Sequence, residues 1–339
     1  MVLSGLCLAQ AGCYLLQAAA GQWSVSAHKR PIPEVLGDPR VPADVRAALA
    51  KVREMRRFAV TDLRLPDNAS YTAYADLGRR FVVWNVFATP EFSVQPVTWC
   101  FPVAGCVAYR GYFHEASARR FALDLESQGH DVLVGGVAAY STLGHFSDPV
   151  LNTVIRWDDA ELAGLVFHEL AHQVAYARDD SAFNEAFATA VEREGVRRWK
   201  SAAGLVTDPA DAERLGARRR ALASFATRAR NRLAGVYARP LPAAERRAAK
   251  RDAFAALRDE YAAGVSAGTL PAGYERVFDN NASLLAIATY EDCVPGFERL
   301  LAAVDGDLTA FYARVRALAA APRAARRAAL GDPASGSCR

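Results

Sequence analysis

The sequence lacks any apolar run long enough to cross a bilayer, which takes roughly 20 consecutive residues in a helix. It also lacks internal repeats and low-complexity linkers. Hydrophobic residues make up 52% of the 339 residues and charged residues 23%, a balance typical of a globular chain and not of a disordered one. A chain of this length accommodates one large domain or two modest ones.

Cysteine is scarce, with six residues, and no two of them form a CxxC pair. A zinc cluster built on thiolates is therefore not expected. Cys100 and Cys106 bracket "FPVAG", a loop whose proline and glycine can bring the two sulfur atoms together. If the protein is exported, this pair is the best candidate for a disulfide; otherwise the two are small buried residues.

A strong excess of charge is absent too, because the net charge is +4 and the isoelectric point is near 8.7. Much of the basic charge is arginine in Ala- and Arg-rich stretches such as "GARRRALASFATRARNR", which are typical of solvated helix faces. No aromatic residues are interleaved with these basic residues in the way nucleic-acid binding requires. A nucleic-acid partner is therefore not expected.

The segment 1–22 is apolar and rich in small residues, and Ala11 and Gly12 stand directly before Cys13. A small pair before a cysteine is typical of the end of a bacterial lipoprotein signal. The segment has no basic n-region, however, and Gln10 stands where a leucine is usual. Two expectations follow: a protein on the periplasmic side of the bacterial envelope, anchored through a lipidated Cys13, or a cytoplasmic protein that begins with an ordinary helix.

The pattern of apolar residues predicts an α+β fold. Residues 42–65 have helical spacing, residues 115–129 form a helix that ends at a glycine, and three runs rich in β-branched and aromatic residues predict strands at 80–88, 106–113 and 131–141. Almost only helices follow: 159–177, 181–199, 209–234, 243–264, 281–304 and 307–320. We divide the chain into a mixed subdomain, 23–158, a helical subdomain, 159–320, and a tail, 321–339, with the candidate site at the seam.

The motif "HELAH" at 168–172 lies in the first of these helices, among apolar positions. Four residues apart, His168 and His172 project from one face and can offer two imidazole nitrogens to one ion. Glu169 is rotated by about 100° from His168, so it lies beside the ion, where a general base would act on a water that the metal activates. The alternative is two histidines that share a helix by chance.

A catalytic zinc site needs a third protein ligand and an open fourth position. The residues "DDS" at 179–181 are typical of a helix start, which puts Glu185 within the first two turns of the next helix. A short connection favours antiparallel neighbouring helices, so Glu185 can face back toward His168 and His172 as the third ligand. Glu192 lies seven residues further along the same face, as a residue behind the ligands or as an acid for a substrate amine.

"HELAH" followed by "NEAFA" resembles the glutamate-zincin metallopeptidases, in which two histidines and a glutamate on the next helix bind zinc. Segments between residues 12 and 305, among them "TWCFPVAGCVAYRGYF" and "NNASLLAIATYEDCVPGFERLL", resemble an uncharacterised bacterial family of predicted zinc aminopeptidases. The resemblance implies a zincin-like fold, a zinc cofactor and a peptide substrate. Two features depart from better-known zincins. Only residues 173–184 separate His172 from Glu185, which is a short gap, and Thr189 stands where some relatives keep a carboxylate that orients a ligand.

In related zincins an edge strand before the metal helix pairs with the substrate backbone. The segment "VGGVAAYSTLG" at 134–144 occupies that place here, and its glycine pair would let another backbone approach closely. Tyr140 and Ser141 near its end are the expected substrate contacts, together with Glu192. A plain core strand with a glycine bulge is the alternative.

Other roles have several candidates. The α-amine of an aminopeptidase substrate could be held by Glu192 or Glu91, although spacing indicates neither. The candidates for stabilising an oxyanion are Tyr109, Tyr112, Tyr140 and Tyr290. Four histidines without ligand spacing are expected at the surface: His28, His114, His130 and His145.

We therefore predict a zinc-dependent peptidase, in the first place an aminopeptidase, with zinc on His168, His172 and Glu185 and with Glu169 as general base. A zinc endopeptidase is the close variant. The competing class is a non-catalytic metal-binding envelope protein; a purely structural site would close the fourth position and would not need Glu169. A basic interaction protein that uses the Arg-rich helices is a third alternative.

Overall fold

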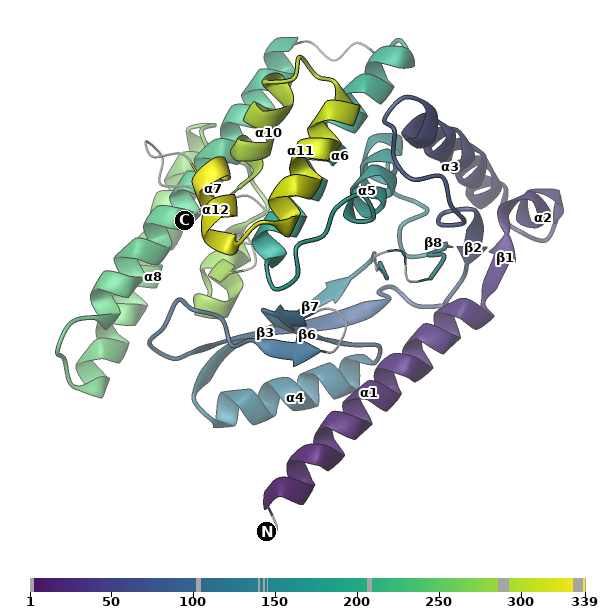
Figure 1. Ribbon diagram of the computed structural model, residues 1–339. Coiled ribbons are helices and arrows are strands. Elements are labelled where there is room, and N and C mark those ends of the chain that lie inside the picture. The colour runs from purple at the N-terminus through teal and green to yellow at the C-terminus, as the bar shows by residue number, and fades with distance from the viewer. Residues whose placement is uncertain are drawn as a thin grey trace.

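The computed structural model describes residues 3–101, 105–139, 141–142, 144, 146–205, 209–285, 293–331 and 338. Small sheets and a few helices form the first half of the chain, and helices form nearly all of the second half (Figure 1). This confirms the predicted α+β class. None of the described helices combines the length and the apolar character that crossing a membrane would take.

The N-terminal part begins with the helices α1 (Leu3–Ala27), α2 (Ile32–Gly37) and α3 (Ala43–Thr61). α3 lies within the predicted helix 42–65 and buries one apolar stripe, as the periodicity indicates. The short strands β1 (Lys29–Pro31), β2 (Ala73–Ala75) and β8 (Val150–Leu151) form a three-stranded sheet in the order β1-β2-β8.

The central sheet has the order β6-β3-β7, built from β3 (Val83–Pro90), β6 (Tyr109–Tyr112) and β7 (His130–Val137). All its pairs are antiparallel, and Asn85 of β3 lies opposite Gly111 of β6 and Gly135 of β7. The register of β3 with β7 is continuous, without a bulge. The predicted strands 80–88 and 131–141 therefore exist, with shifted ends.

The single strand predicted over 106–113 is wrong, because the structure has two strands there. β5 (Gly105–Val107) pairs with β4 (Trp99–Phe101) in a separate hairpin, whereas β6 pairs with β3. Cys100 and Cys106 are directly opposite in that hairpin and form a disulfide, which confirms the predicted pair. The chain changes sheets at Ala108, a break that composition alone does not mark.

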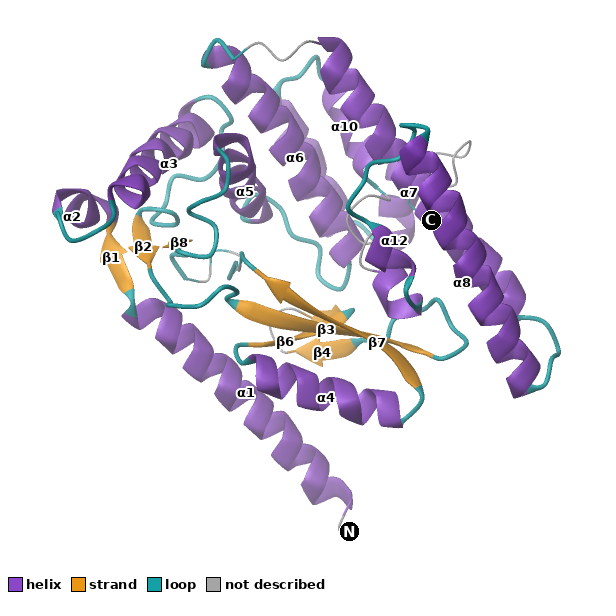
Figure 2. Cartoon of the chain, turned by 180° about the vertical axis from the view of Figure 1, so that it is seen from behind, coloured by secondary structure: helices purple, strands orange, loops and turns teal. Residues whose placement is uncertain are grey.

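One face of the central sheet is covered by α4 (Glu115–Ser127), the helix predicted over 115–129. Val86, Ala88 and Tyr112 on this face are buried against α4. The opposite face is turned toward α5 and α6 (Figures 1 and 2). Its residues Asn85, Phe87 and Tyr109 are only half-buried, so this face stays partly accessible.

The helices α5 (Asp159–His172) and α6 (Ser181–Ala202) pack against each other. Asp158 starts α5 with a capping box, in which its side chain accepts from the backbone N–H of Glu161 at 2.8 Å. The helix ends at His172, earlier than the predicted 177. Gly195 permits the close packing, because a Cβ there would lie 2.7 Å from the Phe167 ring.

The helical half continues with α7 (Pro209–Tyr237), α8 (Ala243–Ser266) and the short 3-10 helix η1 (Glu275–Phe278). It ends with α10 (Val294–Ala302), α11 (Leu308–Ala320) and α12 (Arg323–Leu330). The continuous helix predicted over 281–304 is wrong. Residues 281–285 are helical, but Cys293 lies in a turn and α10 begins after it. Pro295 suits the first turn of a helix and would break the interior of one.

The largest apolar cluster joins α3 with α5, α6, α10 and α11, and a second cluster joins α7 and α8 with η1. The main core therefore contains residues from both sides of the proposed boundary at 158. The division into subdomains remains a prediction.

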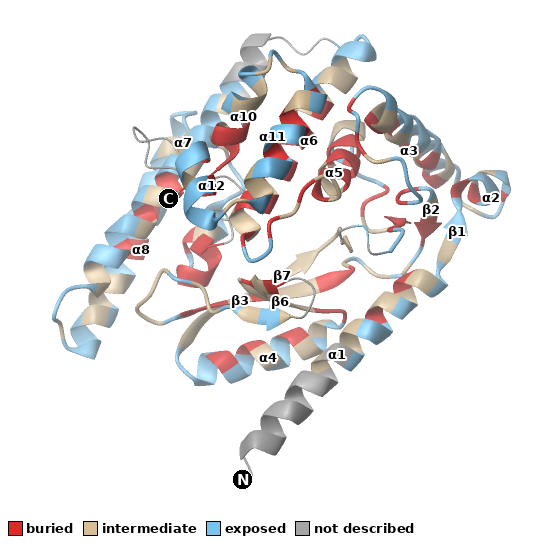
Figure 3. Cartoon of the chain, in the orientation of Figure 1, coloured by how far each residue is buried: buried red, intermediate tan, exposed pale blue. Residues whose placement is uncertain are grey.

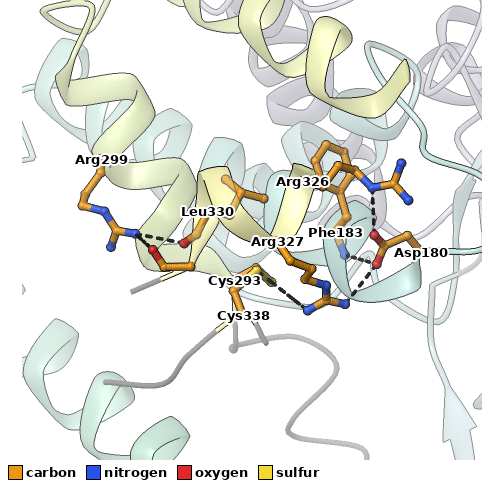
Figure 4. Close-up of a disulfide and its surroundings, with 9 residues drawn as sticks. Asp180, Phe183, Cys293, Arg299, Arg326, Arg327, Leu330 and Cys338 are labelled. Carbon is orange, nitrogen blue, oxygen red and sulfur yellow. Dashed lines mark hydrogen bonds and ion pairs between the residues drawn. A yellow bond between two sulfur atoms is a disulfide. The ribbon is translucent and has the colours of Figure 1, made fainter. Parts of the chain in front are cut away.

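The segment 321–339, interpreted as a tail, contains α12 (Figure 4). Arg326 of α12 is buried and forms an ion pair with Asp180, the N-cap residue of α6, at 2.9 Å. Arg327 contacts the other oxygen of Asp180 at 3.2 Å. A disulfide between Cys293 and Cys338, which the sequence did not indicate, lies beside Arg327. α12 is thus attached to α6, the helix that carries Glu185.

Replacing Arg326 with methionine should lower the free energy of unfolding by about 3 kcal/mol, because breaking a buried ion pair leaves the Asp180 carboxylate with one arginine, Arg327, in place of two. Urea unfolding followed by circular dichroism measures this loss. Arg323→Met, on an exposed position of the same helix, is the control and should change stability by less than about 0.5 kcal/mol. Equal, small losses for both variants would contradict a structural role for the ion pair.

Candidate metal centre

The connection between α5 and α6 brings the histidine helix and Glu185 together. Asn184, the first residue of the "NEAFA" motif, is buried and closes this connection on Ala177: its Oδ1 accepts from the Ala177 N–H at 2.7 Å, and its Nδ2 donates to the Ala177 carbonyl at 2.9 Å. Asp180 caps α6 by accepting from the N–H of Phe183. Figure 3 shows α5 as a largely buried helix, so the two histidines project from an element that is packed into the core.

His168, His172 and Glu185 form a group in which one ligand atom of each lies within 4.8 Å of the others. Nε2 of His168 is 3.2 Å from Nε2 of His172 and 3.4 Å from Oε2 of Glu185, and Nε2 of His172 is 3.8 Å from that oxygen. Tetrahedral ligands at zinc's usual bond lengths of about 2.0–2.1 Å would stand about 3.4 Å apart. Two imidazoles and a carboxylate at these distances could therefore hold such an ion with small shifts.

The charges of the three residues suit a cation. Burial raises the pKa of Glu185, but the hydrogen bond from His168 and the nearby histidines outweigh burial and lower it, so the carboxylate is ionised. Burial lowers the pKa of His172 to about 4, which keeps its imidazole neutral with a lone pair to donate. Burial also acts to lower the pKa of His168, yet Glu185 and Glu192 outweigh it and raise the pKa to about 10. A metal ion would take the place of that proton.

Glu192 lies on the far side of the His168 ring from this group. Its Oε2 lies 3.0 Å from Nδ1 of His168 and can accept a hydrogen bond from it, so a metal ion that replaced the Nε2 proton would leave the remaining proton on Nδ1. Gly164, one turn before His168, makes room for this contact, because a Cβ there would lie 3.2 Å from Cγ of Glu192. Glu192 thus supplies the orienting carboxylate that Thr189 lacks; the substrate contact predicted for it remains a prediction.

Glu169 lies beside the group and is half-buried. Burial, followed by the charges of Glu185 and Asp148, raises its pKa to about 7, although His168 and a hydrogen bond from Ser141 act in the opposite direction. A carboxyl group with a pKa near the working pH can both accept and return a proton. Ser141, predicted as a substrate contact, therefore lies in the site as a partner of Glu169.

Asp148 organises the loop that carries Ser141. This buried residue accepts from the backbone N–H of Thr142 at 2.9 Å and from the Thr142 hydroxyl at 2.9 Å, and the Ser141 hydroxyl lies 3.4 Å from it. Its backbone carbonyl also accepts from the N–H of Tyr71 at 2.7 Å. Asp148 was not predicted as a site residue, because nothing in its spacing links it to Glu169.

Several tyrosines surround the acidic residues. Burial, followed by the charge of Glu185, raises the pKa of both Tyr109 and Tyr176, and the charge of Glu169 also acts on Tyr109 and on Tyr71. Tyr109 thus remains a candidate for stabilising an oxyanion, and Tyr71 and Tyr176 join it. The candidate Tyr112 is wrong, because it packs against α4 on the opposite face of the sheet. Tyr140 and Tyr290 lie outside the described residues.

The predicted edge strand corresponds to β7, which in the described part of the chain pairs with β3 alone. A Cβ at Gly136 would lie 2.4 Å from the Phe81 ring, whereas one at Gly135 would meet nothing within 4 Å. Gly136 is therefore needed for packing, and Gly135 leaves open space above the sheet. Glu91 is engaged by Arg247 at 2.6 Å and has no contact with the metal group. Of the predicted surface histidines, His28 and His114 are exposed and His130 is half-buried, while His145 lies outside the described residues.

Replacing Glu192 with glutamine should weaken Zn²⁺ binding by about 10- to 100-fold, because losing a carboxylate behind a ligating histidine has an effect of that size. Competition with a zinc-chelating dye measures the affinity. Glu194→Gln is the control on the same helix, since Glu194 pairs with Arg197 and Arg198 instead. Unchanged affinity in Glu192→Gln would show that this contact does not tune the site.

Comparison with known proteins gives one family. The model of the family described as "Putative aminopeptidase" matches residues 13–330. No curated protein matches the chain, and no solved structure does. The match begins at Cys13 and extends through α12, so it includes every residue of the metal group and its supports. The chain belongs to the family described as "Putative aminopeptidase".

Proposed function

We propose that the protein is a zinc-dependent aminopeptidase of the zincin type, which binds the metal through His168, His172 and Glu185. The observation that carries the proposal is the meeting of these three ligand atoms beside Glu169. The family supports peptidase action in general. Two histidines one turn apart and a glutamate on the next helix are the donor set of a catalytic zinc site.

Zinc at this position would supply Lewis acidity, polarising the scissile carbonyl and lowering the pKa of the attacking water. Glu169 accepts the proton of that water and then delivers it to the leaving amine. Ser141 holds Glu169 by a hydrogen bond, and Glu192 holds His168. Tyr109 stands at the sheet side of the site, where a hydroxyl could steady the oxyanion.

A non-catalytic metal site is the competing function. Among the described residues, the group contains three ligands and no fourth histidine, cysteine or carboxylate. A structural zinc site normally has four protein ligands. The half-buried Glu169, with a pKa raised to about 7, has no role in a merely structural site, which favours the enzyme. An endopeptidase would use the same chemistry and differ only in substrate length.

The proposed location is the periplasmic side of the bacterial envelope, with Cys13 as the lipid-modified residue and peptides as substrates. The disulfides Cys100–Cys106 and Cys293–Cys338 support export, because disulfides persist in oxidising compartments and are rare in the cytosol.

The catalytic assignment predicts two different kinds of loss. Glu169→Gln should retain stoichiometric zinc yet lose about 10²–10⁴-fold in peptide hydrolysis, because an amide cannot accept the proton of the water. Glu185→Ala should lose zinc and activity together. Metal analysis and a peptide-library cleavage assay on the same preparations measure both properties. Full activity in Glu169→Gln would refute the catalytic role, and stoichiometric zinc in Glu185→Ala would place the third ligand elsewhere.

The location is tested with the protein expressed in a bacterium behind its native leader. The wild type should enter the detergent phase in a Triton X-114 partition, whereas Cys13→Ser should stay in the aqueous phase, because it cannot take lipid. Replacing Cys106 by serine is the matched control and should leave partitioning unchanged. Wild-type protein that stays aqueous and cytoplasmic would contradict the envelope proposal.

A further inference from the structure

The free edge of β7 is closed at one end by a side chain. On the side of β7 that faces β3, the carbonyl of the odd-numbered Val137 accepts from the N–H of Val82, the residue before β3, at 2.9 Å. On the side that faces away from β3, the carbonyl of Val132 accepts from Nδ2 of Asn280 at 3.0 Å, and this contact closes the edge. The backbone groups of a strand alternate in direction, so the even-numbered residues of β7 point outward.

The other end of this edge is closed as well. The carbonyl of Ala138, just beyond β7, accepts from the hydroxyl of Thr153 at 2.5 Å. Between the two closed ends, the outward-pointing residues are Val134 and Gly136, and their outward groups have no partner within the described part of the chain. The edge therefore offers two open pairing positions to an added strand.

This short open edge leads to the proposed catalytic base. Four residues after the end of β7, the hydroxyl of Ser141 hydrogen-bonds Glu169. An extended peptide that paired with Val134 and Gly136 would leave the edge beside the Thr153 hydroxyl and continue toward Glu169. Addition of a peptide to a sheet edge is a common mode of recognition, because backbone hydrogen bonds give affinity without a sequence requirement.

Neighbouring hydrogen bonds and an ion pair hold Asn280 in place against β7. Oδ1 of Asn280 accepts from the N–H of Ser283 at 2.9 Å and so caps the helical turn 281–285. The N–H of Asn281 donates to Asp131 at 3.0 Å, and Asp131 forms a half-buried ion pair with Lys250 of α8 at 2.6 Å. Asn280 is thus held against β7 by two neighbouring contacts and is not a mobile surface side chain.

We propose that Asn280 determines substrate length, by ending the open edge of β7 and so limiting how many substrate residues can lie along it. The inference rests on the proposed peptidase function and deepens it. With two open pairing positions and a rise of about 3.3 Å per residue, about three substrate residues fit along the edge between the Thr153 hydroxyl and the Asn280 amide. The site would then act on short segments at a chain end.

Two variants separate the side chain's reach from its capping role. Asn280→Ser keeps an oxygen to cap the turn 281–285 but is too short to cover Val132, so it should open the edge. Asn280→Gln keeps a side-chain amide that can donate to the Val132 carbonyl, so the edge should stay closed. Matched unfolding midpoints for the two variants would establish that both keep the fold.

The probes are alanine peptides of two to eight residues, in one series extended at the amino end and one extended at the carboxyl end. Binding to Glu169→Gln protein is measured by calorimetry, and cleavage by the zinc-loaded protein by mass spectrometry. Extension beyond the limit at one end should weaken binding about tenfold, as expected for displacing the hydrogen bond from the Asn280 amide to the Val132 carbonyl. Adding Asn280→Ser should remove that penalty, and adding Asn280→Gln should keep it.

Binding that is independent of length in both series would overturn the proposal, and so would a limit that Asn280→Ser leaves unchanged. Loss of the limit in both variants would overturn it too, because general loosening of the turn would then explain the change. A length limit in binding without cleavage by the zinc-loaded wild type would support the role of Asn280 while contradicting the proposed peptidase function. The two claims can therefore fail separately.

Discussion

The turn between α5 and α6 is the constraint on which the site depends. His168 and His172 share a face because of helix geometry, but Glu185 meets them only if α6 returns at the right angle and height. Asn184 fixes that return through its two hydrogen bonds to Ala177. Asp180 starts α6, and its buried charge is balanced by two arginines of α12. The geometry of the ligands thus rests on a residue beside Glu185 and on a helix almost 150 residues later.

A second constraint is the balance of charge around His168. Its ring stands between two carboxylates, Glu185 on the side of the ligand group and Glu192 on the other. The contact with Glu192 keeps a proton on Nδ1, so Nε2 is the nitrogen that remains available to a cation. Gly164 is part of the same arrangement, because a side chain there would crowd Glu192. Since Gly164 lies four residues before His168, the helix repeat that pairs the histidines also sets this gap.

Local pattern predicted much of this from the sequence. The HExxH spacing, the helix-start residues before Ser181 and the next glutamate were enough to bring His168, His172 and Glu185 together, and the α+β class followed from the order of strand and helix patterns. What was missed depends on contacts distant in sequence. The break between β5 and β6 is set by different partner strands, and the pairing of Asp180 with α12 has no local signal. The role of Glu192 also needed the packing of α6 on α5, since spacing alone left it open between two roles.

The central claim is that one metal ion is shared by His168, His172 and Glu185 while Glu169 stands beside it. Anomalous diffraction at the zinc absorption edge, on crystals of the protein purified with zinc, tests this most directly. The account predicts a single strong peak about 2.0–2.2 Å from Nε2 of His168, Nε2 of His172 and an oxygen of Glu185, with Glu169 and Glu192 outside bonding distance. A peak at another group, or a peak bonded to Glu169 or Glu192 in place of Glu185, would contradict it.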